Sequence, residues 1–343
     1  MRVKMKLAAA AMAVSATTAS MAPAGAEELV LYCSPQIEWC NVMVEAFTRE
    51  TGIDVLMTRK SSGETFAQIK AESANPRGDV WWGGTGDPHL QAAEEGLTEV
   101  YKSPLLPKLH DWAQRQAEQS GYRTVGIYAG ALGFGYNSEL LEQKGLPAPA
   151  CWADLTNPAL KNEVEIANPN SSGTSYTMLA TMVQLMGEDK AFAYLKELHK
   201  NIAQYTKSGS APIKDAARGE VTIGIVFQHD AVTQAVNGFP IVTVAPCEGT
   251  GYEIGSMSII KGGPNPEAAK KFYDFALRAD VQELAAKAKA YQVPSNTEAK
   301  APPQAPDLST IKLIDYDFKK YGSAEERTRL LKKWDAEIGS LAK

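Results

Sequence analysis

Short apolar segments alternate with helix-like segments along this chain, and this order constrains its fold more than any other feature. Residues 29–33 form an apolar run, and apolar side chains then recur at helical spacing over 39–47 until Thr51 and Gly52. The pattern repeats as extended 53–58, helical 65–73, extended 79–82 and helical 88–95. Strands that alternate with helices in this way predict an α/β fold, with a mainly parallel sheet covered by helices on both faces.

A second series of the same kind begins near residue 164 and predicts a second α/β unit. Its elements are a strand at 164–167, helices at 175–186 and 189–200, and a strand at 222–227. The 343 residues are enough for two domains of ordinary size. With 44% hydrophobic and 22% charged residues, disordered and coiled-coil classes are poor fits.

Three β-like segments connect the two units and are candidate hinge strands. They are 124–128 and 133–137, which flank Gly130, and 253–260. Helical patterns return at 266–277, 281–289 and 325–341, and the Pro-rich residues 301–307 are typical of a linker. We therefore expect one lobe from residues 27–127 with 258–308, and a second lobe from 128–257 with 309–343.

The N-terminus has the composition of a secretory signal peptide. Basic residues at positions 2, 4 and 6 precede a mostly apolar stretch over 7–22, and Ala24 and Ala26 are the small residues of a cleavage site before Glu27. The apolar stretch is short and rich in Ser and Thr, which disfavours the alternative of an uncleaved membrane anchor. We expect residues 1–26 to be a signal peptide and the product to reach the periplasm.

The four cysteines are expected to form disulfides, because an even number of cysteines in an oxidising compartment is usually paired. Four cysteines allow three pairings. We favour Cys33 with Cys40, which closes a short loop after the first strand, and Cys151 with Cys247. A zinc site is the alternative, but no two cysteines have the spacing of a zinc knuckle, and we predict no metal.

Several function classes are disfavoured by the sequence. The net charge of −5 and the lack of a concentrated basic segment argue against nucleic acid as a partner. The sequence contains no Gly-x-Ser-x-Gly elbow, no His-Glu-x-x-His, no phosphate-binding loop ending in Gly-Lys-Ser/Thr and no complete Gly-x-Gly-x-x-Gly. A secreted phosphatase or hydrolase is therefore the weaker alternative to a binding protein, and no cofactor is predicted.

Ligands of open α/β sheets bind beyond the carboxyl ends of the strands. We therefore expect the loops after Tyr32, Trp82, Ala167 and Phe227 to face the site. The loop 168–175 has several hydroxyls around one glycine and precedes a predicted helix, which suits a phosphate or carboxylate. Residues 61–64 repeat this pattern. The alternative for both loops is helix N-capping, which Ser and Thr also favour.

Two further strand ends carry candidate ligand contacts. Glycine occupies three of the last four positions of 81–86, so a ligand could approach the backbone there, and Trp82 could stack on a sugar ring or instead fill the core. His229 and Asp230 follow another predicted strand, and a histidine beside an acid can hydrogen-bond hydroxyls or pair with an anion. The alternative for Asp230 is a helix cap.

Three segments, 29–52, 75–84 and 262–272, carry a family resemblance. In them the chain resembles the periplasmic solute-binding proteins of ABC importers, in the two-domain group with ferric-iron, phosphonate, thiamine and sugar-phosphate binders. The resemblance implies a two-lobed type II periplasmic binding protein fold that closes on a small anionic solute by a hinge. It also implies ABC permease and ATPase subunits as partners, and a monomeric protein.

The resemblance separates the iron branch of this group from the sugar-phosphate branch. In the iron branch, a histidine, a glutamate and two tyrosines hold the metal. The aligned positions in this sequence are Gln36, Gly84, Gln228 and His229. These residues lack the carboxylate and phenolate oxygens that ferric iron needs. The second branch has a His-Asp pair and a later glutamate on the sugar hydroxyls. His229, Asp230 and Glu253 match that pattern. A hexose phosphate is therefore the expected solute, and ferric iron or a phosphonate is the alternative.

These residues predict a cleft with two chemically different ends. The phosphate end consists of Ser34, Ser61, Ser62, Thr85, Ser172, Gly173, Thr174 and Ser175. The sugar end consists of His229, Asp230 and Glu253, with Trp82 as the stacking residue. Because a buried acid repels a phosphate, the acids and the hydroxyl loops should lie at opposite ends.

Overall fold

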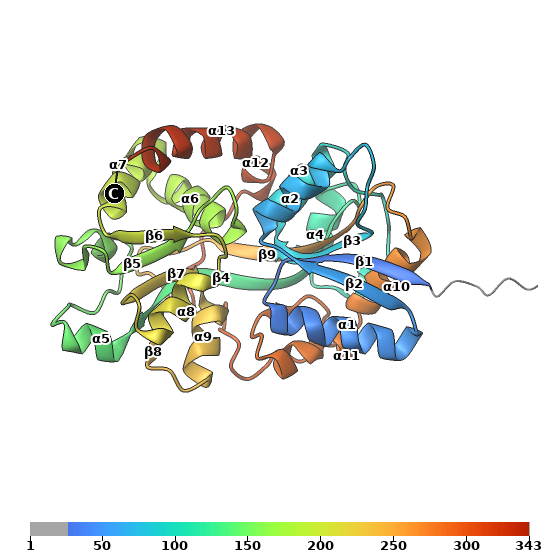
Figure 1. The fold of residues 1–343 in the computed structure, drawn as a ribbon, viewed down its shortest axis with the longest axis horizontal. Coiled ribbons are helices and arrows are strands. Elements are labelled where there is room, and N and C mark those ends of the chain that lie inside the picture. Colours follow the sequence, from blue (N-terminus) through green and yellow to red (C-terminus); the bar gives the residue numbers. More distant parts are fainter. Residues whose placement is uncertain (1–26, 343) are drawn as a thin grey trace, which may run out of the picture.

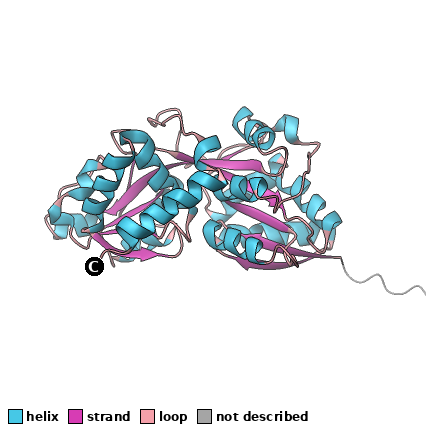
Figure 2. Cartoon of the chain, turned by 90° about the horizontal axis from the view of Figure 1, so that it is seen from above, coloured by secondary structure: helices cyan, strands magenta, loops and turns pink. Residues whose placement is uncertain are grey.

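The structure is a computed structural model that describes residues 27–342, so the predicted signal peptide lies outside the described residues. Figure 1 shows two lobes side by side, each a sheet with helices on both faces, and Figure 2 shows the two lobes from above. The two-lobed α/β fold predicted from the sequence is confirmed. The sheet is mixed rather than mainly parallel, because residues 125–137 and 252–259, which join the lobes, run antiparallel to their neighbours. None of the described helices is long and apolar enough to cross a membrane.

The first lobe contains the N-terminal strands. β1 pairs in parallel with both β2 and β3, as the strand-helix alternation predicts. Its elements are β1 (Glu28–Cys33), α1 (Ile37–Thr51), β2 (Asp54–Arg59), α2 (Ser62–Ala71), β3 (Val80–Thr85), α3 (Gly86–Glu94), α4 (Asp111–Gln119), α10 (Pro266–Ala276), α11 (Ala279–Gln282) and β10 (Val293–Pro294). Phe47 and Phe272 pack edge to face at the centre of its core, with ring centroids 5.1 Å apart.

The second lobe has a separate core that includes Trp152, Tyr176 and Trp334. Its elements are α5 (Ser138–Gln143), β5 (Val164–Ala167), α6 (Gly173–Met186), α7 (Glu188–His199), β6 (Ile202–Thr206), α8 (Ala211–Arg218), β7 (Ile223–Phe227), α9 (Gln228–Val236), β8 (Ile241–Val244), α12 (Phe318–Tyr321) and α13 (Ala324–Trp334). Short 3₁₀ helices lie at Leu106–Lys108, Ala153–Thr156, Pro158–Leu160 and Glu283–Ala288, and a π-helical turn at Asp335–Gly339.

A single long strand, β4 (Val125–Asn137), passes from one lobe into the other. Its first half pairs with β9 (Tyr252–Ile259), and its second half pairs with β7 and β8. The described strands thus form one 10-stranded sheet in the order β2-β1-β3-β9-β4-β7-β5-β6, with β8 and β10 also paired to β4.

The two predicted β-like segments around Gly130 are both present, as parts of one strand, because the backbone stays extended through this glycine. A Cβ at position 130 would lie 2.5 Å from His229 Nδ1, so Gly130 makes room for the histidine ring rather than breaking the strand. The third predicted hinge segment is present as β9, which pairs with β3 and β4. The lobe boundaries given above stay a prediction.

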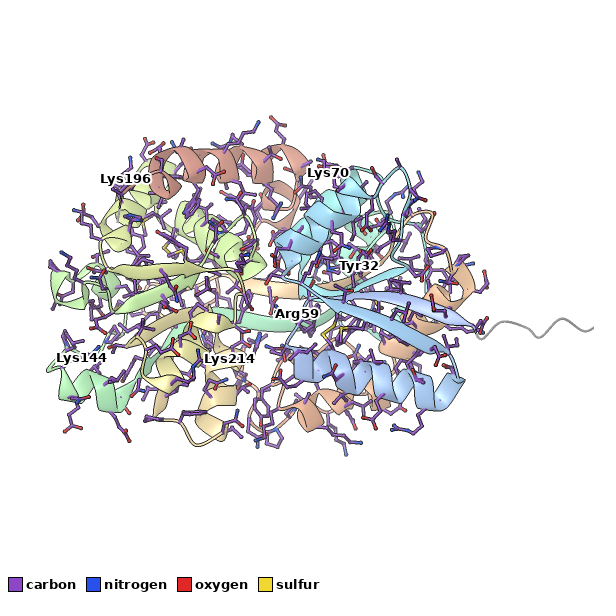
Figure 3. The ribbon with its side chains drawn as sticks, viewed as in Figure 1. Tyr32, Arg59, Lys70, Lys144, Lys196 and Lys214 are labelled. Atoms are coloured by element: carbon purple, nitrogen blue, oxygen red, sulfur yellow. A yellow bond between two sulfur atoms is a disulfide. The ribbon has the colours of Figure 1, made fainter. Side chains whose placement is uncertain are left out.

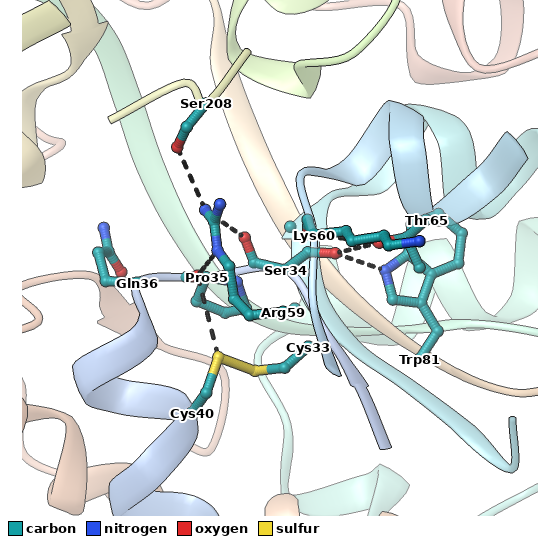
Figure 4. Close-up of a disulfide and its surroundings, with 12 residues drawn as sticks. Cys33, Ser34, Pro35, Gln36, Cys40, Arg59, Lys60, Thr65, Trp81 and Ser208 are labelled. Carbon is teal, nitrogen blue, oxygen red and sulfur yellow. Dashed lines mark hydrogen bonds between the residues drawn. A yellow bond between two sulfur atoms is a disulfide. The ribbon is translucent and has the colours of Figure 1, made fainter. Parts of the chain in front are cut away.

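Both favoured disulfides are present in the structure. Cys33–Cys40 joins the end of β1 to the first turn of α1, with a Cα–Cα distance of 6.1 Å (Figure 4). Cys151–Cys247 joins two loops of the second lobe, 96 residues apart in sequence. The first disulfide encloses residues 34–39, so it restricts the loop that follows β1.

Candidate functional site

A pocket lies between the lobes, where the carboxyl ends of strands from both lobes meet. All four loops that the strand-end rule selects contribute to its wall. The lining residues are Ser34, Pro35, Gln36, Arg59, Ser61, Ser62, Gly84, Thr85, Tyr128, Ser172, Gly173, Thr174, Gly209, Ser210, Phe227, His229, Asp230, Glu253 and Gln292. Figure 3 shows one of them, Arg59, where the two lobes meet.

Five helices begin at this pocket. The N-cap residues of α2, α3, α6, α8 and α9 are Ser61, Thr85, Ser172, Ser210 and Phe227, and all five line it. The positive end of each helix dipole therefore faces one space, together with N-terminal amides that have no partner within their own helices. The side chains of Thr85, Ser172 and Ser210 make no cap hydrogen bond, so N-capping does not account for these hydroxyls.

The hydroxyls of the first lobe divide into occupied and available groups. Ser34 Oγ accepts a hydrogen bond from Trp81 Nε1 at 2.9 Å, and Ser62 Oγ accepts one from the Thr85 backbone at 3.2 Å. Among the described residues, Thr85 Oγ1 is buried and has no hydrogen-bond partner. Because burying an unpaired hydroxyl costs free energy, Thr85 points to a polar group that binds in the pocket.

Arg59, the last residue of β2, brings a positive charge to the same wall. Its guanidinium donates from Nε to the Pro35 carbonyl at 2.9 Å, and from Nη2 toward the Ser34 carbonyl and Ser208 Oγ, each at 3.4 Å (Figure 4). Burial lowers the pKa of Arg59 and the nearby Asp230 carboxylate raises it, but an arginine remains charged in proteins. No carboxylate of the described residues lies within 4.0 Å of this guanidinium, so its charge is available to an anion.

His229, Asp230 and Glu253 form a second group of polar side chains in the pocket. His229 Nε2 lies 3.7 Å from Glu253 Oε1 and 3.9 Å from Asp230 Oδ2, and all three side chains are buried. The ring of His229 stacks on Phe227, and its Nδ1 has no partner among the described residues. The N-cap of α9 is Phe227 rather than Asp230, so Asp230 does not cap this helix.

Burial sets the protonation of this second group. It lowers the pKa of His229, and it raises the pKa of Glu253 well above the ordinary value, with Asp230 and Asp87 raising it further. The lowered pKa keeps His229 neutral near neutral pH, and the raised pKa of Glu253 favours its protonated form. The imidazole and the two carboxyl groups together offer both donors and acceptors, as hydroxyl groups require.

Three sets of hydrogen bonds cross the pocket from one lobe to the other. Gln36 Nε2 donates to Asp230 Oδ1, and Arg59 donates to Ser208. The backbone amides of Gly63 and Glu64 donate to the Ser171 carbonyl at 3.0 and 3.3 Å. The lobes are thus in direct contact around the pocket.

Two of the predicted site residues do not line the pocket. The Trp82 ring is 2% exposed and packs edge to face against Trp39 at 5.0 Å, so it belongs to the core and no sugar can stack on it in this arrangement. Ser175 lies buried in the first turn of α6, beyond the residues of that loop that reach the pocket. The other predicted residues all contribute to the lining.

Sequence reasoning missed several lining residues, of which Gln36, Arg59, Tyr128, Ser210 and Gln292 carry side-chain polar groups. Arg59 and Ser210 could have been found, because each stands where a strand is followed by a helix, the position used to select the other loops. Tyr128 lies within β4, and no neighbouring sequence pattern marks it as a site residue. Its hydroxyl accepts a hydrogen bond from the Gly84 amide at 2.9 Å. Gln292 belongs to a segment in which no sequence pattern marks a binding residue.

Comparison with known proteins places this site in context. Residues 85–320 match the family described as bacterial extracellular solute-binding protein. An uncharacterized protein of Haemophilus influenzae is 49% identical over 312 residues, which cover 90% of each chain.

Two solved structures are similar over nearly the whole described chain. The periplasmic binding protein AfuA from Actinobacillus pleuropneumoniae, with exogenous fructose-6-phosphate bound, is 49% identical with a TM-score of 0.90, covering 92% of this chain and 99% of AfuA. The periplasmic binding protein P5PA is 42% identical with a TM-score of 0.89, covering 91% and 99%.

Proposed function

This chain belongs to the family of bacterial extracellular solute-binding proteins, and from that premise we propose that it captures a hexose phosphate in the periplasm for an ABC importer. The solute would bind in the pocket between the lobes, and the lobes would close on it by a hinge. An ABC permease and its ATPase would then receive the solute from the closed form. This role requires no cofactor and no covalent step.

The convergence of five helix N-termini and Arg59 on one pocket carries this proposal. A phosphate group has the charge and the acceptor oxygens that unpaired amides, Ser and Thr hydroxyls and a guanidinium all favour. Thr85, Ser172 and Thr174 would donate from their hydroxyls, and Arg59 would supply the counter-charge. Structural similarity to AfuA, whose structure contains fructose-6-phosphate, supports a sugar phosphate.

The other end of the solute would be a polyol that contacts His229, Asp230 and Glu253. Burial favours the protonated form of Glu253, which then donates, whereas Asp230 accepts a hydrogen bond from Gln36. An aminoalkyl phosphonate, the alternative with the same anionic end, would present an ammonium group, which donates hydrogen bonds but cannot accept them. Sugar hydroxyls pair with these groups without a charge mismatch.

Titration calorimetry with fructose 6-phosphate, fructose and inorganic phosphate tests the proposal. We expect the phosphorylated sugar to bind most tightly, and to stabilise the folded protein by about 2.7 kcal/mol at a concentration of one hundred Kd. Fructose that binds as tightly as its phosphate would contradict the anion-binding role of the helix N-termini. A yellow-to-red colour on addition of ferric iron would indicate phenolate ligation and would favour the iron alternative instead.

Replacement of Asp230 by Ala is expected to weaken binding of fructose 6-phosphate by about tenfold to a hundredfold, because the variant loses acceptors for buried hydroxyls. The binding of inorganic phosphate should change much less. Both affinities are measured by calorimetry, together with the melting temperature. If Asp230 served only the fold, the Asp230→Ala protein would melt earlier and keep its solute affinity.

A further inference from the structure

The C-terminal helix α13 places a buried arginine between the two lobes. Arg327 is 3% exposed, whereas Leu330 and Trp334 of the same helix pack in the core of the second lobe. Figure 1 shows α12 and α13 running along the second lobe toward α3 of the first lobe. The Ala324 amide donates to Glu94 of α3 at 2.6 Å, so the start of α13 contacts the first lobe directly.

The contacts of the Arg327 guanidinium come from both lobes. Nη1 donates to Gln91 Oε1 of α3 at 2.7 Å. The guanidinium carbon lies 5.5 Å from the ring of Phe66 on α2 and 5.0 Å from the ring of Tyr176 on α6. Arg327 thus joins two helices of the first lobe to one helix of the second.

The same three helices, α2, α3 and α6, begin at the pocket. Phe66, Gln91 and Tyr176 lie four to six residues after the respective N-caps Ser61, Thr85 and Ser172. Arg327 therefore contacts each helix one to two turns behind the end that faces the pocket. Arg327 does not line the pocket itself, so it acts on the pocket through these helices.

We propose that Arg327 is a positioning residue for solute binding, which holds the N-termini of α2, α3 and α6 together across the two lobes. This inference rests on the proposed function in so far as the solute binds where these helices begin. Separation of the lobes would withdraw the guanidinium from Phe66 and Gln91 or from Tyr176. The contacts of Arg327 consequently favour the arrangement in which the three N-termini converge.

A purely electrostatic role is the competing explanation. Asp87, in the first turn of α3, is buried, and burial raises its pKa to about 6 while the positive charge of Arg327 opposes this rise. Arg327 could therefore serve only to compensate Asp87. Removal of both charges distinguishes the two roles, because it abolishes the need for compensation but does not restore the contacts across the lobes.

The test compares Arg327→Met with the double variant Arg327→Met/Asp87→Asn by calorimetry with fructose 6-phosphate and with inorganic phosphate. We expect each to bind about tenfold more weakly than the wild type, because a stacked, hydrogen-bonded guanidinium is lost. Arg329→Met is the matched control, since Arg329 pairs with Glu188 and Glu326 of its own lobe and should keep full affinity. Wild-type affinity of the double variant would reduce Arg327 to charge compensation and overturn the proposal.

Two further measurements keep the inference separate from the proposed function and from misfolding. Failure of the wild-type protein to bind fructose 6-phosphate would count against the proposed function. The positioning role of Arg327 would then be tested by the affinity for inorganic phosphate and by small-angle scattering. We expect scattering to give a larger radius of gyration for Arg327→Met, and identical scattering with identical affinities would overturn the inference. If the Met variants do not fold, Arg327→Lys decides, because lysine cannot reproduce the planar contacts, and wild-type affinity would again overturn it.

Discussion

Replacement of Arg59 by Met is expected to weaken the binding of fructose 6-phosphate by about a hundredfold or more, with little change in melting temperature, because a buried anion then loses its counter-charge. Arg59 is the one Lys or Arg side chain among the described residues that line the pocket. Hydrogen bonds with Pro35 and Ser34 already hold its guanidinium in place, so little conformational entropy is lost when an anion binds. Calorimetry at two salt concentrations measures the effect.

The control for this variant is Arg77→Met, which removes the same charge from an exposed position of the first lobe. Solvent and salt screen a charge at the surface, so its affinity should stay near that of the wild type. Arg59→Lys should recover part of the lost affinity, because lysine keeps the charge without the planar fork. Equal loss in Arg77→Met and Arg59→Met would show that only the overall charge matters, and would remove Arg59 from the site.

Gly63→Ala is expected to lower solute affinity by about a hundredfold while the melting temperature stays the same or rises, because overpacking of a rigid contact costs up to about 3 kcal/mol. A Cβ at position 63 would lie 2.2 Å from the Asn170 carbonyl oxygen and 2.9 Å from the Ser171 carbonyl carbon. Both are backbone atoms of the opposite lobe, and they cannot move aside as a flexible side chain would. The added methyl therefore obstructs closure and leaves each lobe intact.

Gly78→Ala provides the contrasting control. Its methyl would lie 2.6 Å from the ring of Tyr32 and 2.8 Å from the side chain of Ile260, both within the first lobe. This variant should melt at a lower temperature and bind solute normally, which is the reverse of the result for Gly63→Ala. The prediction for Gly63 fails if its variant retains wild-type affinity or loses affinity only in step with stability.

Local sequence patterns were sufficient to predict the fold class and most of the pocket wall. The alternation of strands and helices places the loops after Tyr32, Trp82, Ala167 and Phe227 at one edge of the sheet, and all four line the pocket. This prediction succeeds because the order of strands and helices along the chain is enough to show which loops follow the carboxyl ends of strands. His229 and Asp230 were found for the same reason.

The missed features depend on contacts between distant segments. Trp82 lies near the end of a strand, which is why it was predicted to reach the pocket. Its ring instead packs on Trp39 of α1, a contact that the local sequence does not show. The sequence around Gly130 suggested two segments, but they form one continuous strand. The glycine is needed there because the ring of His229 occupies the space of a side chain. Arg59 was visible as a strand end. Its importance follows from its place in the pocket without a salt bridge to any described residue, which only the assembled structure shows.

The hydrogen bonds that cross the pocket have a consequence for how the protein would work in the cell. The bonds from Gln36, Arg59 and Gly63 act between the lobes themselves, so they raise the population of closed molecules whether or not a solute is inside. A bond worth about 1 kcal/mol changes that population by roughly fivefold. If the protein serves an ABC importer as proposed, the same bonds would also set how often a molecule without solute engages the permease.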